Sequence, residues 1–344
     1  MSQAAIRELA DTHAFNARPR TSDQRQVYVP FDDLQAGARA ERRVADLVQA
    51  GSRVGLVGPT GSGKSSLIEY VLARDPFALV TVPVSLDDDR VAGEPKLFAQ
   101  HLVRALCRYG DASARLEQED RIRALTEASD RDVRTADRLR HARGGVNVGL
   151  LRGDAAVEFA SSAVRIDLGR PATEIARAAG RLFDLLRAHE LQPVVAVDDS
   201  DKWLAAAAEP MIEAFFGRVL PWIAELGTAI VVALQPAPYL RRHAYREARR
   251  AGVPEHEVTM PGLVGPVQVA GILGRRIDVG GVAERVERIF TPDAVQALFD
   301  YYAGEAGHSL RKMLNAANCA VDLAAEAGAA AVDGGLMKEG IADR

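Results

Sequence analysis

Cysteine and lysine are both scarce in this sequence of 344 residues. The two cysteines, Cys107 and Cys319, cannot supply a disulfide framework and lack zinc-ligand spacing, so we expect a reducing, cytoplasmic environment. Only five of the 43 basic residues are lysines, and the other 38 are arginines. Against that bias, a lysine that is kept indicates a need for a compact ammonium rather than a planar guanidinium.

Long apolar runs are also absent. No stretch approaches the roughly 18 apolar residues of a membrane-spanning helix, and the N-terminal MSQAAIRELADTHAF lacks the apolar core of a signal peptide, so we expect no membrane association. A net charge of −4 gives no overall attraction to nucleic acid, so such a contact would depend on local patches. The length predicts two packed units.

Short apolar strands alternate with amphipathic helices over most of the chain. Apolar runs predict strands at 53–58, 77–85, 194–197 and 228–235. Helical periodicity predicts helices at 33–49, 65–73, 95–108, 173–189 and 211–226. Two further short strands are predicted within 146–159, around an Arg-Gly-Asp turn. Such alternation is typical of a parallel α/β sheet with helices on both faces.

The strands stop at about residue 263, and the rest of the chain is predicted to be helical. Helices are expected at 266–277, 292–303 and 309–327, with Thr291 and Pro292 as the N-cap and first residue of the second. Residues 1–30 are polar and show no clear period. We therefore expect an N-terminal extension (1–32), an α/β nucleotide-binding domain (33–262, with an insertion at 111–165) and a small helical domain (263–344).

A phosphate-binding motif follows the first strand. GPTGSGKSS matches the pattern G-x-x-x-x-G-K-[ST] between a predicted strand and a predicted helix. Its backbone N–H groups and the N-terminus of the following helix would wrap a phosphate, Lys64 would reach the β- and γ-phosphates, and Ser65 would bind Mg²⁺. The predicted nucleotide-binding residues are Gly58, Pro59, Thr60, Gly61, Ser62, Gly63, Lys64, Ser65 and Ser66.

A second acidic element follows the strand at 194–197. In VVAVDDSD, Asp198 is predicted to lie on the metal side, Asp199 to orient or deprotonate the attacking water, and Asp201 to be a flanking acid. An acidic turn after a strand is common in α/β proteins, so this assignment depends on the phosphate-binding motif that precedes it.

These ordered motifs resemble those of the AAA+ ATPases, especially the origin-recognition and initiator branch and related bacterial DNA-transaction ATPases. GPTGSGKSS matches the Walker A motif and VVAVDDSD matches Walker B. TAIVVALQ occupies the place of the sensor-1 strand, which makes Gln235 the residue that would touch the γ-phosphate or water. Residues 289–321 resemble the helical lid, with Arg311 as the sensor-2 arginine after Gly307. The resemblance implies a P-loop NTPase fold, a parallel sheet between helices followed by an all-helical lid domain.

The sequence departs from the family at three points. Asp199 stands where the family usually has Glu, and its side chain is one methylene shorter. The spacing from Gly307 to Arg311 is one residue longer than the common pattern, and we expect no winged-helix domain after the lid.

Arginine-rich stretches suggest two further roles. In YLRRHAYREARR, which follows the sensor-1 strand, the resemblance makes Arg241 and Arg242 candidates to act at a neighbouring subunit's site. For either arginine alone, a solvated basic helix face is the slightly favoured interpretation. Within the insertion, RDVRTADRLRHARGG suits phosphate contacts better than base stacking, and nearby acidic residues equally favour a salt-bridged exposed helix.

The favoured function is a Mg²⁺-dependent ATPase of the AAA+ type, which forms homo-oligomers and acts on DNA or on a DNA-bound protein. The alternative is a slow nucleotide-gated signalling switch similar to the STAND NTPases, which commonly carry two aspartates where this chain has Asp198 and Asp199. Against this alternative, we expect no repeat array of the kind that such switches carry after the predicted lid.

Overall fold

The computed structural model describes residues 2–12, 14–16, 26–34, 39–73, 76–83, 93–115, 158–159, 162–163, 166–198, 209–236 and 243–343. The chain divides into two compact units. The helical unit comprises Met1–Glu41, Pro59–Leu67 and Met260–Arg344, and the α/β unit comprises Arg42–Gly58 and Ile68–Thr259. The domain boundaries inferred from the sequence, with the insertion at 111–165, stay predictions.

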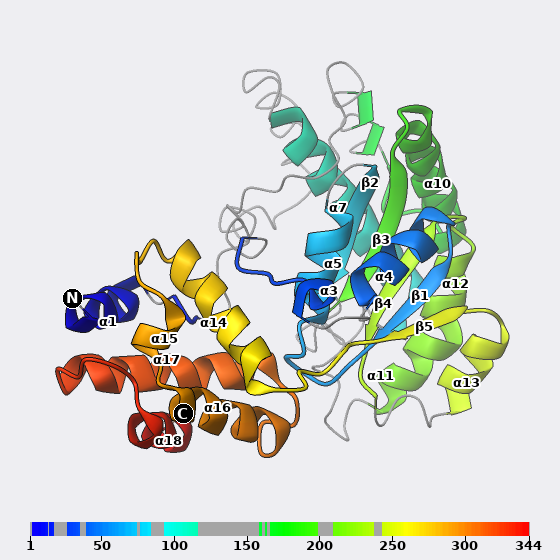
Figure 1. Ribbon diagram of the computed structural model, residues 1–344. Helices are drawn as coiled ribbons and strands as arrows, with labels where there is room; N and C mark the ends of the chain where they lie inside the picture. The colour runs from blue at the N-terminus through cyan, green and yellow to red at the C-terminus, as the bar shows by residue number, and fades with distance from the viewer. Residues whose placement is uncertain are drawn as a thin grey trace. The chain divides into compact units, whose positions relative to one another are not determined.

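A parallel sheet of five strands forms the centre of the α/β unit (Figure 1), with the order β2-β3-β4-β1-β5. Its strands are β1 (Arg53–Val57), β2 (Phe77–Pro83), β3 (Gln192–Asp198), β4 (Ala229–Leu234) and β5 (His256–Thr259). The first four confirm the predicted strands. The edge strand β5 was not predicted, because Val258 is the one buried residue in its sequence HEVT and four residues show no usable period.

Helices cover both faces of this sheet, as the alternating pattern predicted. They are α4 (Ala40–Gln49), α5 (Lys64–Leu72), α7 (Pro95–Arg115), α10 (Ala172–Ala188), α11 (Glu209–Ala214), η5 (Phe215–Val219), α12 (Leu220–Ala224) and α13 (His243–Arg250). The predicted helix at 211–226 is confirmed, with a π-helical turn, η5, in its middle. The predicted strands within 146–159 lie mostly outside the described residues, and Glu158 and Phe159 are helical.

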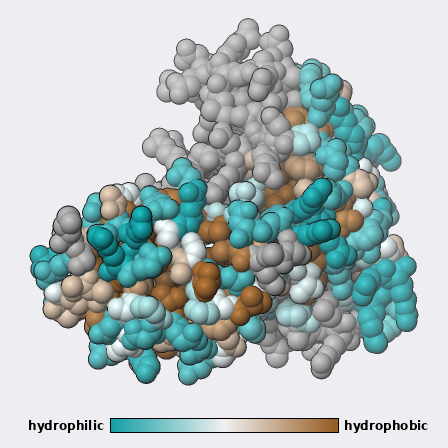
Figure 2. Space-filling model, in the orientation of Figure 1, coloured by the Kyte–Doolittle hydropathy of each residue, from teal (hydrophilic) through white to brown (hydrophobic). Residues whose placement is uncertain are grey.

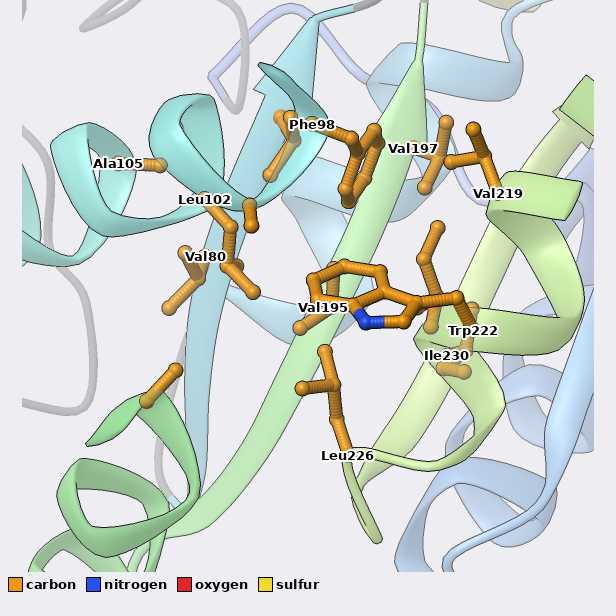
Figure 3. Close-up of a cluster of buried hydrophobic side chains, with 14 of the residues drawn as sticks. Val80, Phe98, Leu102, Ala105, Val195, Val197, Val219, Trp222, Leu226 and Ile230 are labelled. Atoms are coloured by element: carbon orange, nitrogen blue, oxygen red, sulfur yellow. The ribbon is translucent and has the colours of Figure 1, made fainter. Parts of the chain in front are cut away.

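The two faces of β3 are buried by different helices. Val195 and Val197 point towards α7 and α12, where Phe98 and Trp222 meet edge to face with ring centroids 6.1 Å apart (Figure 3). Their neighbours Val194 and Ala196 are equally inaccessible to solvent and point the other way, because successive side chains alternate across a strand. Helices α4 and α5 lie on that second side (Figure 1). Burial on both faces explains why β3 consists of consecutive apolar residues.

The helical unit contains α1 (Ser2–Thr12), α3 (Phe31–Leu34), α14 (Pro266–Val279), α15 (Val286–Ile289), α16 (Pro292–Ala303), α17 (Leu310–Glu326) and α18 (Gly334–Ala342). The three helices predicted after residue 263 are confirmed as α14, α16 and α17. Thr291 is the N-cap residue of α16 with Pro292 in the first turn, as expected, but its side chain makes no capping hydrogen bond. The Thr291 hydroxyl donates instead to the carbonyl of Val332, 3.3 Å away.

The N-terminal residues pack into the helical unit. Helix α1 contacts α17 and α15, and its Ile6 and Leu9 are completely buried. After α1, Phe15 meets Phe290 edge to face at 5.5 Å, and the guanidinium of Arg276 donates to the carbonyl of Asn16 at 2.7 Å. The sequence reading of residues 1–30 as having no period was therefore wrong for α1. Its two large apolar residues, Ile6 and Leu9, lie one turn apart, which is too short a stretch to show a period.

Hydrophilic side chains predominate on the outer helices of the α/β unit in the face shown in Figure 2. Within the described parts of the chain, no helix is long and apolar enough to cross a membrane.

Candidate functional site

Three of the predicted site residues lie at one edge of the sheet in the α/β unit. Gly58, Asp198 and Gln235 stand at the carboxyl ends of β1, β3 and β4, and in parallel strands these ends share one edge. Strand β4 lies between β1 and β3, so Gln235 follows the central strand of the three. The N–H of Gly58 donates to the carbonyl of Leu234 at 3.0 Å, which continues the β1–β4 ladder by one bond. Ligand sites of open α/β sheets lie at this edge.

The loop after Gly58 begins with a tight turn. The N–H of Ser62 donates to the carbonyl of Pro59 at 3.2 Å, and Gly61, at the third position of this turn, has φ +76°. A positive φ at that position is the mark of a type II turn, which requires glycine. Gly63 also has a positive φ, +96°. These two glycines therefore provide a backbone path that side-chain-bearing residues rarely adopt.

Lys64 begins α5 and is nearly inaccessible, with 7% of its surface exposed. Its ammonium donates to the carbonyl of Pro59, 2.9 Å away, so the side chain folds back over the loop. Ser62 is 4% exposed, and its hydroxyl is buried without a hydrogen-bond partner among the described residues. A buried hydroxyl without a partner is costly unless a ligand with acceptor oxygens binds there, and the lysine of the same loop supplies a positive charge. The loop therefore fits a phosphate group.

The first turn of α17 contacts this loop within the helical unit. The backbone N–H of Arg311 donates to the carbonyl of Gly61 at 3.2 Å. Ser309 is the N-cap residue of α17, and its hydroxyl accepts from the N–H of Lys312 at 3.4 Å. The turn before it contains two successive left-handed residues, Gly307 with φ +59° and His308 with φ +61°. Arg311 is thus the second residue of a helix that follows a glycine, while its sensor-2 role stays a prediction.

The described residues include the whole predicted phosphate-binding motif, Gly58 to Ser66, together with Asp198, Gln235 and Arg311. The motif from Pro59 onwards and Arg311 belong to the helical unit, whereas Gly58, Asp198 and Gln235 belong to the α/β unit. Asp199, Arg241 and Arg242 lie outside the described residues, as does RDVRTADRLRHARGG. The catalytic, nucleotide-binding and metal roles of all these residues stay predictions.

The packing of Ser309 against Gly61 of the phosphate-binding loop was not predicted from the sequence. A Cβ atom built on Gly61 would lie 2.4 Å from the Ser309 hydroxyl oxygen and 2.8 Å from Arg311 Cβ. The sequence does carry a signal, because serine directly before an amphipathic helix is a common N-cap. Nothing in the sequence indicates that this cap lies against Gly61, because the two residues are far apart in the chain.

Comparison with solved structures identifies the fold. Two archaeal initiator proteins are similar over most of the chain: the Aeropyrum pernix ORC1 protein in complex with DNA and the Aeropyrum pernix ORC2 protein in its ADP form. ORC1 is 16% identical with a TM-score of 0.50, over 93% of this chain and 69% of that one. ORC2 is 16% identical with a TM-score of 0.50, over 94% of this chain and 73% of that one. No model of a protein family matches the sequence, and no curated protein does.

The likeness is one of fold, and it confirms the predicted fold class. The protein has the fold of the initiator-type AAA+ ATPases, a five-stranded parallel sheet with flanking helices followed by a helical C-terminal region.

Proposed function

We propose that this protein binds and hydrolyses ATP at the loop formed by Gly58 to Ser66. The observation that carries the proposal is the arrangement of this loop, in which the left-handed Gly61 and Gly63 curve the backbone beside the buried Lys64. A short strand that enters such a loop, and a helix that leaves it, form the usual surroundings of a phosphate-binding P-loop.

Each residue has a defined part in this proposal. The Lys64 ammonium would leave the Pro59 carbonyl and donate to the β- and γ-phosphates, while the Ser62 hydroxyl would gain an acceptor that it lacks in the described structure. The guanidinium of Arg311 would stabilise negative charge on the γ-phosphate, and the amide of Gln235 would orient the attacking water. Positioning and charge neutralisation supply most of the catalysis of phosphoryl transfer.

The donor set also suits a hard divalent cation. A serine hydroxyl and a carboxylate are oxygen ligands of the type that Mg²⁺ prefers alongside substrate phosphates, and Ser65 and Asp198 are our candidates. The bound cation would neutralise charge on the phosphates as it develops in the reaction. Asp199 would accept the proton of the attacking water.

Phosphate release from ATP tests the proposal. Lys64→Ala should lower turnover by at least about 10²-fold, because it removes a cation that contacts the transferred group. Lys338→Ala is the matched control, because Lys338 is an exposed lysine of α18 in the helical unit and should leave turnover unchanged. Equal turnover by wild type and Lys64→Ala would exclude this loop as the site.

The alternative switch differs in the fate of the nucleotide. A signalling switch would keep its nucleotide bound and turn it over slowly, whereas the ATPase should release ADP repeatedly. The rate of ADP release by the wild type over several turnovers separates the two, and Asp199→Asn tests the assignment of the base. If Asp199 acts as the base, the variant should retain ATP but not cleave it, and hydrolysis at the wild-type rate would assign the base to another residue.

We further propose that the protein assembles into homo-oligomers and acts on DNA or on a DNA-bound protein. One solved structure of the same fold, Aeropyrum pernix ORC1, is a complex with DNA. ATPase rates should be measured with and without duplex DNA at two salt concentrations. Stimulation through phosphate contacts must weaken as salt rises, because counterion release drives such contacts. ATP-dependent assembly that is lost on changing Arg241 or Arg242 to Ala would support an arginine acting between subunits.

A further inference from the structure

We propose that the first turn of α17 holds the P-loop through Gly61, and that Ser309 is the positioning residue of this contact. We name it the Gly61 contact; it consists of the Arg311 N–H···O=C Gly61 hydrogen bond and the packing of Ser309 and Arg311 against the Gly61 Cα. Its existence does not depend on ATP binding. Its consequence, that nucleotide binding and the position of Arg311 are coupled, rests on the proposed function.

The hydrogen bond uses a donor that the helix itself cannot satisfy. The first N–H groups of an α-helix have no carbonyl one turn earlier, so each needs another acceptor or water. In α17 the N–H of Lys312 uses the Ser309 hydroxyl, and that of Met313 uses the Ser309 carbonyl at 3.1 Å. The Arg311 N–H, which precedes both in the sequence, uses the Gly61 carbonyl. The positive end of the helix dipole also favours a carbonyl oxygen at this place.

The packing leaves no room for a side chain on Gly61. Ser309 Oγ would be 2.4 Å and Arg311 Cβ 2.8 Å from an added Cβ, and both distances are shorter than real Cβ contacts. Glycine is therefore required at this position for two separate reasons, the positive φ of the turn and the approach of α17. At Gly63 the nearest atoms of the helical unit would be 3.5 Å and 3.8 Å away, which is ordinary contact. The close approach is thus specific to Gly61.

The turn before Ser309 is held by residues outside the phosphate-binding motif. Ser309 is 4% exposed, and the turn before it is supported by Tyr302, whose ring meets that of His308 edge to face at 5.3 Å. The Tyr302 hydroxyl in turn accepts from the N–H of Leu263 at 3.2 Å, and burial raises the pKa of this phenol. The cap of α17 is therefore fixed by residues that do not belong to the phosphate-binding motif.

This arrangement fixes the origin of the Arg311 side chain relative to Gly61. Any rearrangement of the turn from Pro59 to Ser62 that moves the Gly61 carbonyl must move or break the Arg311 hydrogen bond. We infer that the P-loop reports its occupancy to the start of α17 through this carbonyl, and that Ser309 keeps the helix end in register with it.

Amide hydrogen exchange of the full-length protein without nucleotide tests the contact directly. The Arg311 amide should be protected, and Gly61→Ala should raise its exchange rate by at least about tenfold, as expected for loss of one hydrogen bond. The Ala327 amide is an internal control, because its acceptor, the carbonyl of Leu323, lies at the other end of α17, and its rate should stay unchanged. An unprotected Arg311 amide in the wild type, or an equally protected one in Gly61→Ala, would overturn the proposal.

Gly63→Ala is the matched variant for backbone strain. It places a side chain at a similarly left-handed residue of the same loop without the close approach of α17, so the Arg311 amide should keep its protection. Loss of protection in both variants would show that loop strain alone is responsible and would contradict a specific Gly61 contact. If Gly61→Ala does not fold, the wild-type protection of Arg311 still decides whether the contact exists.

Coupling to nucleotide requires a second readout. Ser309→Ala in the Gly61→Ala background removes the atom at 2.4 Å, so it should recover part of the ATP affinity that Gly61→Ala loses, whereas alone it should not improve affinity. Strictly additive effects would contradict the coupling. If no variant and no wild type binds ATP, the proposed function fails, while the exchange of Arg311 still reports on the contact.

Discussion

Strand β3 of the α/β unit and helix α14 of the helical unit bury different kinds of side chain. In β3 the residues from Val194 to Val197 are completely buried and apolar, with no polar group to satisfy other than the backbone. The helical unit instead buries Arg276 and Gln268 on α14, each 7% exposed. Their partners are backbone carbonyls of the N-terminal segment, those of Ala14 and Asn16 for Arg276 and that of Leu34 for Gln268. Apolar burial thus stabilises the sheet, whereas polar side chains fasten the N-terminal segment along α14.

The cost of the polar arrangement is visible at Arg276. Burial lowers the pKa of its guanidinium to about 10, and its Nε has no hydrogen-bond partner within the described residues. A buried cation is tolerated when it donates to carbonyls, because these hydrogen bonds offset part of the cost of removing the charge from water. The difference between β3 and α14 predicts that truncating a side chain in the sheet core lowers the free energy of unfolding most. Substitutions in the helical unit should lower it less and should change the local stability of that unit.

Phe98→Ala should have the largest effect. It removes a completely buried ring that packs on Trp222 and β3, so the free energy of unfolding of the α/β unit should fall by about 3–5 kcal/mol. Urea denaturation followed by tryptophan fluorescence would measure the change. Leu97→Ala, at the partly buried neighbour on α7, should cost clearly less, and equal costs would argue against a core centred on Phe98.

Gly340→Ala should have an intermediate effect confined to the helical unit. A Cβ at this position would lie 2.6 Å from the backbone nitrogen of Ala320 and 2.8 Å from its Cα, so α18 must move away from α17 at a cost of about 1–3 kcal/mol. Thermal unfolding would show the change. In Gly274→Ala the new atom would be 3.9 Å from Val286, and alanine has the higher helix propensity, so this variant should be neutral or stabilising. Equal destabilisation by both variants would contradict the close packing at Gly340 as the cause.

Arg276→Met should have the smallest effect on global stability, about 1–2 kcal/mol, because the lost hydrogen bonds are partly offset by removal of a buried charge. Its local effect should be larger, since residues 14 to 16 lose their donor and the amides of α1 should exchange faster. Arg275→Met is the control, because Arg275 is exposed and bonds to the carbonyl of Gln26 instead. Unchanged exchange in α1 would contradict the role of Arg276 in fastening this segment.

The same contrast explains what could be predicted from the sequence. Four strands and most helices were found because buried elements of ordinary length show apolar runs or a helical period. The helices α1, α3, α15 and α18 and the strand β5 were missed, and α13 was considered only as an alternative interpretation. The predicted helix at 33–49 was wrong in extent, because Arg39 is not helical and α4 begins at Ala40. Most of the missed elements are short, and a short segment carries too few apolar residues to show a period. Others depend on tertiary contacts, such as the approach of Gly340 to Ala320.

For the candidate site, the motif from Gly58 to Ser66 predicted a strand, a glycine-rich loop and a helix, all of which are present. The positions of Asp198 and Gln235 at the ends of β3 and β4 also followed from the strand pattern. The approach of Ser309 to Gly61 could not be predicted, because it depends on how distant segments pack and on no local pattern. Residues that contact one another across such a distance become visible only in the folded chain.

Equilibrium binding of ATP tests the central claim most directly. The wild-type protein should bind a fluorescent ATP analogue more tightly with Mg²⁺ than with a chelator, and Lys64→Ala should weaken binding by at least about tenfold, as expected for loss of a charge-assisted hydrogen bond. Lys338→Ala should bind as the wild type does. Absence of binding by the wild type, or equal affinity of wild type and Lys64→Ala, would contradict a nucleotide site at this loop.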